Sequence, residues 1–186
     1  PATSMNQVAE ACHLSKATLY HYSRDKYALL VSIADGHVSR LAAFVEDEQA
    51  LTLAGEERLR HFINRIVEEY SGSHEAHRVL TEDVRFLEPD DRERILNKER
   101  QVVAAFSRAV TEMRPELASA HLAKPPTMLL FGMVNWMFTW MRPDGALDHE
   151  TLAPMVADLF LGGLPAVRLP PDAAQAAQAA QAAQPG

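Results

Sequence analysis

The stretch that decides the fold of this chain is Cys12-His13-Leu14-Ser15-Lys16-Ala17-Thr18-Leu19-Tyr20-His21-Tyr22-Ser23-Arg24-Asp25-Lys26. It reads as the end of one helix, a tight turn, a very short helix and the start of another helix. Ser15 is expected to cap the short helix, because its hydroxyl can accept a backbone N–H from the first turn. Helical spacing then places Leu14, Leu19 and Tyr22 on an inner side. The outer side carries a cation, a small residue, a phenol and an imidazole: Lys16, Ala17, Tyr20 and His21.

This outer side suits a helix that lies in a groove of DNA. Small residues allow close approach, Lys and Tyr reach phosphates, and Thr and His contact base edges. Helix N-termini assist, because their backbone N–H groups suit phosphates. A helix this short needs a helix on each side to hold it. We predict a DNA-binding face made of Ser4, Asn6, Ser15, Lys16, Thr18, Tyr20, His21 and Lys26.

The run from Val8 to Lys26 resembles the helix-turn-helix signature of the TetR family of one-component transcriptional regulators, whose usual form is I-A-x-x-A-G-V-S-x-G-T-L-Y-x-Y-F-x-x-K. His13 stands where Gly is usual, so it is expected in the left-handed region, and Ser23 replaces the usual Phe. The resemblance implies a three-helix DNA-binding domain, and this chain is expected to begin at the second of its helices. It also implies a homodimer that binds a palindromic operator in double-stranded DNA.

Composition and charge bound the other possibilities. The chain has 186 residues, of which 47% are hydrophobic, and a formal net charge of −7. Such a charge repels nucleic acid from most of the surface, but the first forty residues carry four basic and three acidic side chains. DNA binding is therefore expected on one face only. The single Cys12 excludes an intramolecular disulfide and is interpreted as a small buried residue in a reducing cytoplasm.

The spacing of apolar residues predicts an all-α protein, with helices over about 4–11, 25–45, 56–70, 75–87, 90–113, 126–141 and 148–161. We divide it into a helix-turn-helix domain lacking its first helix (1–35), a helical-bundle domain for ligand binding and dimerisation (36–168), and a low-complexity tail (169–186) of Ala-Ala-Gln repeats. The longest apolar run, about 128–141, is shorter than a membrane span, so no membrane partner is expected.

The segment 128–141 is apolar on every side, and a helix of this kind must be covered on both faces. It is read either as a central core helix or as a helix that packs on its own core and on a second subunit. In TetR-like proteins the last two long helices form a four-helix bundle with their partners. The resemblance therefore implies that the helices over 126–141 and 148–161 form the dimer interface.

The same segment places aromatic side chains where they could line a cavity for an apolar ligand, although ordinary core packing explains them equally well. Parts of the C-terminal half, namely 83–89, 135–145 and 158–163, resemble a TetR subgroup that responds to CoA thioesters of fatty or aromatic acids, including regulators of the phenylacetate type. This resemblance implies a repressor released by an acyl-CoA such as phenylacetyl-CoA. The predicted ligand-binding residues are Arg85, Phe86, Phe131, Asn135, Trp136, Phe138, Trp140 and Arg142.

Other classes of protein have less support in the sequence. No catalytic constellation or nucleotide-binding fingerprint is present, so we predict neither an enzyme nor a cofactor. His74 and His77 could share a metal on one helix, but their spacing is not that of zincins and no third ligand is evident. A regulator that responds to another apolar molecule, a small helical metal-binding protein or enzyme, and a helical dimerisation module remain alternatives.

Overall fold

The computed structural model describes residues 3–48, 52–119, 121–141 and 147–171. Within these ranges the chain forms helices and no strand, so the all-α prediction is confirmed. The α-helices are α1 (Met5–Ala11), α2 (Lys16–Tyr22), α3 (Lys26–Glu48), α4 (Gly55–Gly72), α5 (His74–Glu82), α6 (Pro89–Met113), α7 (Pro115–Ser119), α8 (Lys124–Asn135), α9 (Met137–Trp140) and α10 (His149–Gly163). Two 3₁₀ turns, η1 (Val84–Phe86) and η2 (Leu164–Ala166), follow α5 and α10.

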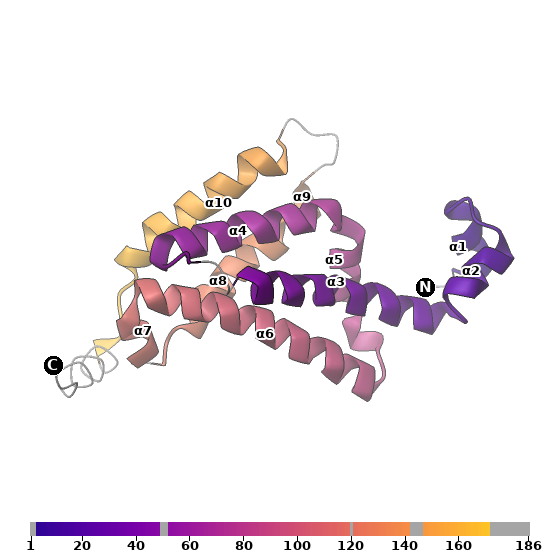
Figure 1. Ribbon diagram of the computed structural model, residues 1–186, viewed down its shortest axis with the longest axis horizontal. Coiled ribbons are helices and arrows are strands. Elements are labelled where there is room, and N and C mark those ends of the chain that lie inside the picture. The colour runs from indigo at the N-terminus through magenta and orange to yellow at the C-terminus, as the bar shows by residue number, and fades with distance from the viewer. Residues whose placement is uncertain (1–2, 49–51, 120, 142–146, 172–186) are drawn as a thin grey trace.

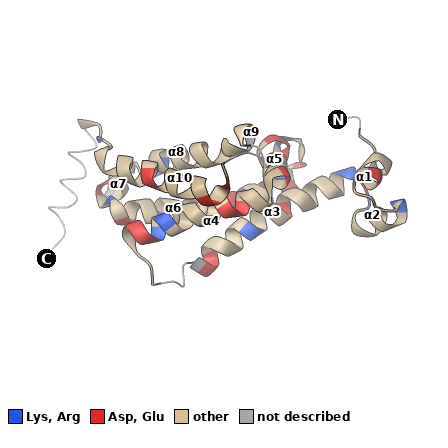
Figure 2. Cartoon of the chain, turned by 90° about the horizontal axis from the view of Figure 1, so that it is seen from above, with Lys and Arg blue, Asp and Glu red and all other residues tan. Residues whose placement is uncertain are grey.

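Helices α1 and α2 form a small unit at one end of α3, apart from the other helices (Figures 1 and 2). Ser4 and Gln7 cap α1 reciprocally, since the Gln7 N–H donates to Ser4 Oγ and the Ser4 N–H donates to Gln7 Oε1. His13 turns the chain with a φ of 55°, the left-handed conformation that the sequence requires at this position. Three buried side chains hold the unit together: Met5, Ala9 and Leu19.

Fewer of the residues predicted on the inner side of α2 are buried than the sequence suggested. Leu19 is buried, but Leu14, which precedes the helix, is 40% exposed, and Tyr22, the last residue of the helix, is 77% exposed. Both lie outside the core of Met5, Ala9 and Leu19. Cys12, expected to be buried, is exposed at the end of α1. Ser23 is buried, and its hydroxyl donates to the backbone oxygen of Asp25.

The 23-residue helix α3 runs from this unit into the body of the protein, where it packs against α5 and α6. Ala34 and Val38 of α3 meet Leu80, Leu87 and Ile95 in one apolar cluster. By length and mean hydropathy alone, Lys26–Asp47 would suffice to cross a membrane. Its contacts are those of a core helix instead, because its apolar side chains pack on neighbouring helices and Asp35 binds two cations of α6.

The body is a bundle in which α4 packs against α6 and α10, and α6 packs in turn against α8. Its core contains a chain of aromatic contacts. Phe62 of α4 lies between Phe44 and Phe106, with ring centroids 5.6 and 5.1 Å apart, and Phe106 meets Phe131 of α8 at 5.0 Å. Edge-to-face and tilted pairs of this kind stabilise a core beyond the apolar area that they bury.

The predicted single helix over 126–141 is wrong, because the chain breaks between α8 and α9 at Trp136. There the Thr139 N–H donates to the Trp136 carbonyl three residues back, at 3.1 Å, and the Thr139 hydroxyl donates to the same oxygen at 2.7 Å. A three-residue bond tightens the turn and interrupts the α-helical ladder. The predicted helix over 75–87 likewise ends at Glu82, with η1 following.

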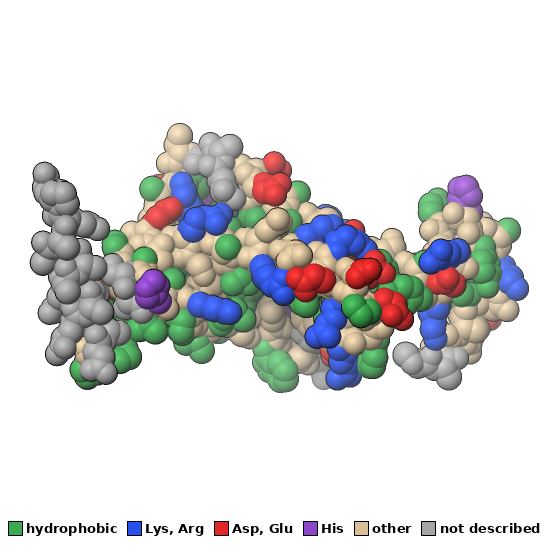
Figure 3. All heavy atoms as spheres, turned by 90° about the horizontal axis from the view of Figure 1, so that it is seen from below, with side chains coloured by type: hydrophobic (Ala, Val, Ile, Leu, Met, Phe, Trp, Pro, Cys, Tyr) green, Lys and Arg blue, Asp and Glu red, His purple; other side chains and the backbone are tan. Residues whose placement is uncertain are grey.

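Helices α8 to α10 leave an apolar face exposed. We call this the α8–α10 face, and its exposed side chains are Leu129, Met133, Trp136, Trp140, Met155 and Leu159. Leu129 and Leu159 are each 70% exposed. The space-filling view shows hydrophobic side chains along one edge of the body, whereas acidic and basic side chains gather on the part nearest the α1–α2 unit (Figure 3). A contiguous apolar patch on a protein surface marks a site of association.

Candidate nucleic-acid interface and effector cavity

Helix α2 presents its outer side to solvent. Ser15 caps the helix as predicted, because its Oγ accepts the Thr18 N–H at 3.0 Å. The two hydroxyls also lie 2.7 Å apart, so Ser15 holds the Thr18 side chain in a fixed position. Lys16 and Tyr20 are both exposed, and the Lys16 ammonium lies 5.8 Å from the centre of the Tyr20 ring.

The remaining predicted DNA-binding residues border the same surface. His21 is exposed in the last turn of α2, and Ser4 and Asn6 are exposed at the start of α1. Lys26 is exposed at the start of α3, where its ammonium donates to the Thr3 carbonyl at 3.1 Å. The arrangement therefore combines one exposed short helix with cations at two helix starts, which is what phosphate and base-edge contacts need.

A cavity of about 150 Å³ lies in the body between α3, α4, α5, α6 and α8. Its walls are mostly apolar, and the polar groups at its surface belong to Tyr70, His77, Thr81, Glu99 and Asn135. The full lining is Val38, Leu41, Tyr70, His77, Leu80, Thr81, Glu99, Val102, Val103, Met128, Phe131 and Asn135. A mostly apolar cavity with a few convergent polar groups is the common form of a small-molecule site.

The polar side chains of the cavity wall are linked to one another. The Tyr70 hydroxyl donates to Asn135 Oδ1 at 3.0 Å, and the Tyr70 ring stacks on His77 with centroids 3.7 Å apart. His77 Nδ1 lies 3.3 Å from Nε2 of His37, a buried residue of α3. Burial lowers the pKa of His37 to about 4 and that of His77 to about 3, so both imidazoles are neutral at physiological pH. Burial also raises the pKa of the Glu99 carboxyl and of the Tyr70 hydroxyl.

The predicted ligand-binding residues divide into groups. Phe131 and Asn135 line the cavity. Trp136 and Trp140 do not, because the break after α8 places them on the α8–α10 face, 65% and 50% exposed. Arg85 and Phe86 lie outside it as an exposed pair, with the guanidinium 4.7 Å from the ring centre. Arg142 and the side chain of Phe138 lie outside the described residues.

Sequence reasoning missed the contributions of α3, α4, α5 and α6 to this cavity. The clearest signal was Glu99, which occupies the apolar stripe formed by Ile95, Val102 and Phe106 at spacings of three and four residues. An acid at such a position faces the interior. His77 is a second example, since it precedes Leu80 on the buried side of α5.

The two histidines weighed as metal ligands border one small pocket beside Tyr70, but their closest contacts differ. His77 faces His37 and Tyr70, whereas the His74 ring lies 3.5 Å from the carboxylate of Glu75. Across the described ranges, no three His, Cys, Asp or Glu side chains come together as a metal site would require.

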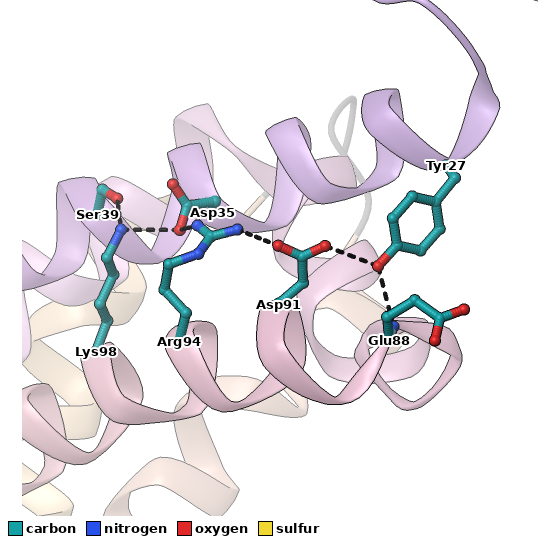
Figure 4. A network of polar contacts seen from close by, with 7 residues as sticks. All are labelled: Tyr27, Asp35, Ser39, Glu88, Asp91, Arg94 and Lys98. Atoms are coloured by element: carbon teal, nitrogen blue, oxygen red, sulfur yellow. Dashed lines mark hydrogen bonds and ion pairs between the residues drawn. The ribbon is translucent and has the colours of Figure 1, made fainter.

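A polar network joins α3 to the first turns of α6, between the cavity and the α1–α2 unit (Figure 4). The Tyr27 hydroxyl donates to Asp91 at 2.8 Å and accepts the Glu88 N–H at 3.0 Å. Arg94 binds both Asp91 and Asp35 at 2.5 Å. Lys98 completes the network by donating to Asp35 at 2.8 Å and to Ser39 at 2.7 Å.

The fold and these two sites define a class of protein: a helical DNA-binding protein in which the long helix α3 joins the exposed short helix α2 to an apolar cavity. The comparisons name its family. Residues 1–33 match the bacterial regulatory proteins of the tetR family, and residues 52–164 match the tetracyclin repressor-like C-terminal domain. The chain belongs to the TetR family of transcriptional regulators and is not an enzyme.

Solved structures agree with this assignment. A TetR-family transcriptional regulator from Bordetella parapertussis 12822 is 31% identical, with a TM-score of 0.79 over 90% of this chain and 88% of that one. PfmR from Thermus thermophilus is 24% identical, with a TM-score of 0.74 over 88% and 90% of the two chains. AibR in complex with isovaleryl coenzyme A and operator DNA is 23% identical, with a TM-score of 0.67 over 84% and 86%. No curated protein matches the chain.

Proposed function

We propose that this protein is a dimeric repressor that binds a palindromic operator through α2 and releases it when a small acyl-CoA enters the cavity. The observation that carries the proposal is the shared wall: Val38 and Leu41 line the cavity and belong to the same helix as Lys26 at the DNA-binding face. A ligand that favours another packing of this wall changes the position of helix α2 in each subunit. It can shift the equilibrium only by its difference in affinity for the two states.

The size of the cavity indicates the kind of acyl group. An apolar cavity of about 150 Å³ in another protein holds one benzene molecule, and the cavity here has about the same volume. It therefore suits a phenylacetyl group or a short branched acyl group, and a long chain requires its expansion. The likeness to AibR in complex with isovaleryl coenzyme A is consistent with a short acyl group, although it bears on the fold alone.

The CoA part would lie outside the cavity. Met128 lines the cavity and is also 46% exposed, which places an opening beside α8. Arg85 remains our proposed contact for a CoA phosphate, because within the described part of the chain its exposed guanidinium meets the Phe86 ring and no carboxylate. Arg142 is a second proposed contact. Since the effector and the operator are both found in the cytoplasm, we place the protein there.

The α8–α10 face supports the dimer. Its exposed apolar side chains on α8, α9 and α10 are those that a second copy would cover, and obligate interfaces of this kind bury roughly 2,000 Å² or more. A two-fold axis through this face gives two reading units, as a palindromic site requires.

The test is operator binding by the purified dimer, using a DNA site selected from random sequence. Titration with phenylacetyl-CoA or isovaleryl-CoA should release the DNA, and free CoA should not. Palmitoyl-CoA should be less effective at equal concentration. If no thioester changes the affinity for DNA, the acyl-CoA proposal is wrong, whereas release by another apolar compound supports a TetR-type regulator with a different effector.

A further inference from the structure

Glu99 is a carboxylate in a wall that is otherwise apolar or neutral. It lies on α6 one turn after Ile95, and it lines the cavity together with Val102 and Val103. It is half-buried, and within the described ranges its carboxyl forms no hydrogen bond or ion pair. A buried charge without a partner is costly, so a ligand group that satisfies it gains affinity.

Among the described residues, Arg100 is the cation that acts on Glu99 through space, but it does not line the cavity. The two chain neighbours of Glu99 bind elsewhere: Lys98 donates to Asp35 and Ser39, and Arg100 binds Glu93 at 2.7 Å. No Lys or Arg is among the residues that line the cavity. The imidazoles of His37 and His77 are neutral because burial lowers the pKa of each. Among the described residues that line the cavity, the ionised Glu99 is therefore the only formal charge.

The hydrogen-bonding groups around Glu99 add a second preference. The Tyr70 hydroxyl already donates to Asn135 Oδ1, and the Thr81 hydroxyl donates to backbone oxygens of its own helix. The N–H groups of the Asn135 amide are left as donors for a ligand carbonyl. The described wall thus offers donors to a carbonyl and an acceptor to an N–H group, but no cation to balance a carboxylate.

We infer that Glu99 makes the cavity selective by charge: it accepts a hydrogen bond from a neutral or cationic ligand group and repels a carboxylate. The inference rests on the proposed function in taking the cavity as the effector site. It explains how a regulator of acid metabolism could ignore the free acid and respond to its thioester or amide. The reaction that supplies the effector would then be one that activates a carboxylic acid, since activation removes the charge that Glu99 repels.

Three compounds of nearly equal size test the inference by calorimetry at neutral pH: phenylacetate, phenylacetamide and phenethylamine, whose charges are −1, 0 and +1. A like charge within about 4–6 Å disfavours an ion by about one pKa unit or more, which corresponds to about tenfold in affinity. The unaltered protein should therefore bind the amide at least about tenfold more tightly than the acid. Glu99→Gln should reduce that ratio by about tenfold and weaken binding of the amine.

The control is Asp90→Asn, which makes the same change of net charge on the same helix but away from the cavity lining, and which should leave the ratio unchanged. The inference is overturned if the unaltered protein binds acid and amide equally, if Glu99→Gln leaves the ratio unchanged, or if none of the three compounds binds. The first comparison requires no variant, so a folding defect of Glu99→Gln does not remove the test. Operator release by phenylacetyl-CoA is measured separately, and either result can fail without the other.

Discussion

Leu129 and Leu130 are adjacent on α8 but lie in different environments, which makes them a matched pair for testing the dimer. Leu129 is 70% exposed on the α8–α10 face, whereas Leu130 is 1% exposed in the core of the body. Replacing either by Ala removes the same three carbon atoms. The two variants should therefore separate association of the subunits from folding of each subunit.

The size of the effect follows from the exposed fraction of Leu129. At about 0.8 kcal/mol per buried carbon, three carbons that a partner covers by 70% contribute about 1.7 kcal/mol per subunit. Two symmetric copies then contribute about 3.4 kcal/mol, so Leu129→Ala should raise the dimer dissociation constant about 300-fold. Leu130→Ala should instead destabilise the folded subunit by about 2–5 kcal/mol through the cavity that it leaves.

Sedimentation velocity over a range of protein concentrations measures the first effect, and thermal unfolding measures the second. We expect Leu129→Ala to dissociate at concentrations where the unaltered protein is dimeric, with unchanged helical content. The reasoning is refuted if Leu129→Ala dissociates no more readily than the unaltered protein. A folded monomer of the unaltered protein at micromolar concentration would also reject the interface.

Three further predictions concern the DNA-binding unit and the buried histidines. Ser15→Ala removes the cap of α2, so hydrogen exchange of its amides should accelerate about fivefold, for a loss of about 1 kcal/mol; unchanged exchange would contradict the role of the cap. Lys16→Ala should lower the slope of log K against log salt concentration by about one for every DNA sequence alike, which filter binding at several salt concentrations can check. His37 and His77 have folded-state pKa values below 6.5, so the unfolded state takes up protons first as the pH falls. Stability should therefore decrease from about pH 6.5 toward pH 4, and urea unfolding should show a weaker decrease for His77→Gln but not for the exposed His21→Gln.

Local sequence was sufficient for much of the fold. The turn at His13 and the caps at Ser4 and Ser15 were predicted correctly, because each depends on residues within three or four positions. The long helices α3 and α6 were likewise predictable from their apolar spacing. The short α7 was missed. The break at Trp136 was also missed, because no pattern within an apolar run indicates that the Thr139 hydroxyl donates to the Trp136 carbonyl.

The cavity was predictable only in part, because its walls come from five helices that are distant in the sequence. Periodicity places Phe131 on a buried side, but it does not distinguish a side that meets the core from one that meets solvent or a partner. For that reason the sequence did not indicate that Trp136 is exposed on the α8–α10 face and does not line the cavity. Glu99 could have been found, since it is an acid at a position where the stripe requires an apolar residue.

The ion pairs of Asp35 divide α3 into two unequal arms, about which the helix would rotate once the Tyr27 contacts with Asp91 and Glu88 open. Leu41 at the cavity is six residues beyond Asp35, or about 9 Å, and Lys26 is nine residues before it, or about 14 Å. Rotation about Asp35 that moves the cavity wall by about 1 Å therefore moves the start of the helix by about 1.5 Å the other way. In a symmetric dimer the displacements of the two α3 starts add to about 3 Å. The separation of the two DNA-binding units then no longer matches successive major grooves, which are about 34 Å apart. A small internal shift is thus enlarged at the surface that reads DNA.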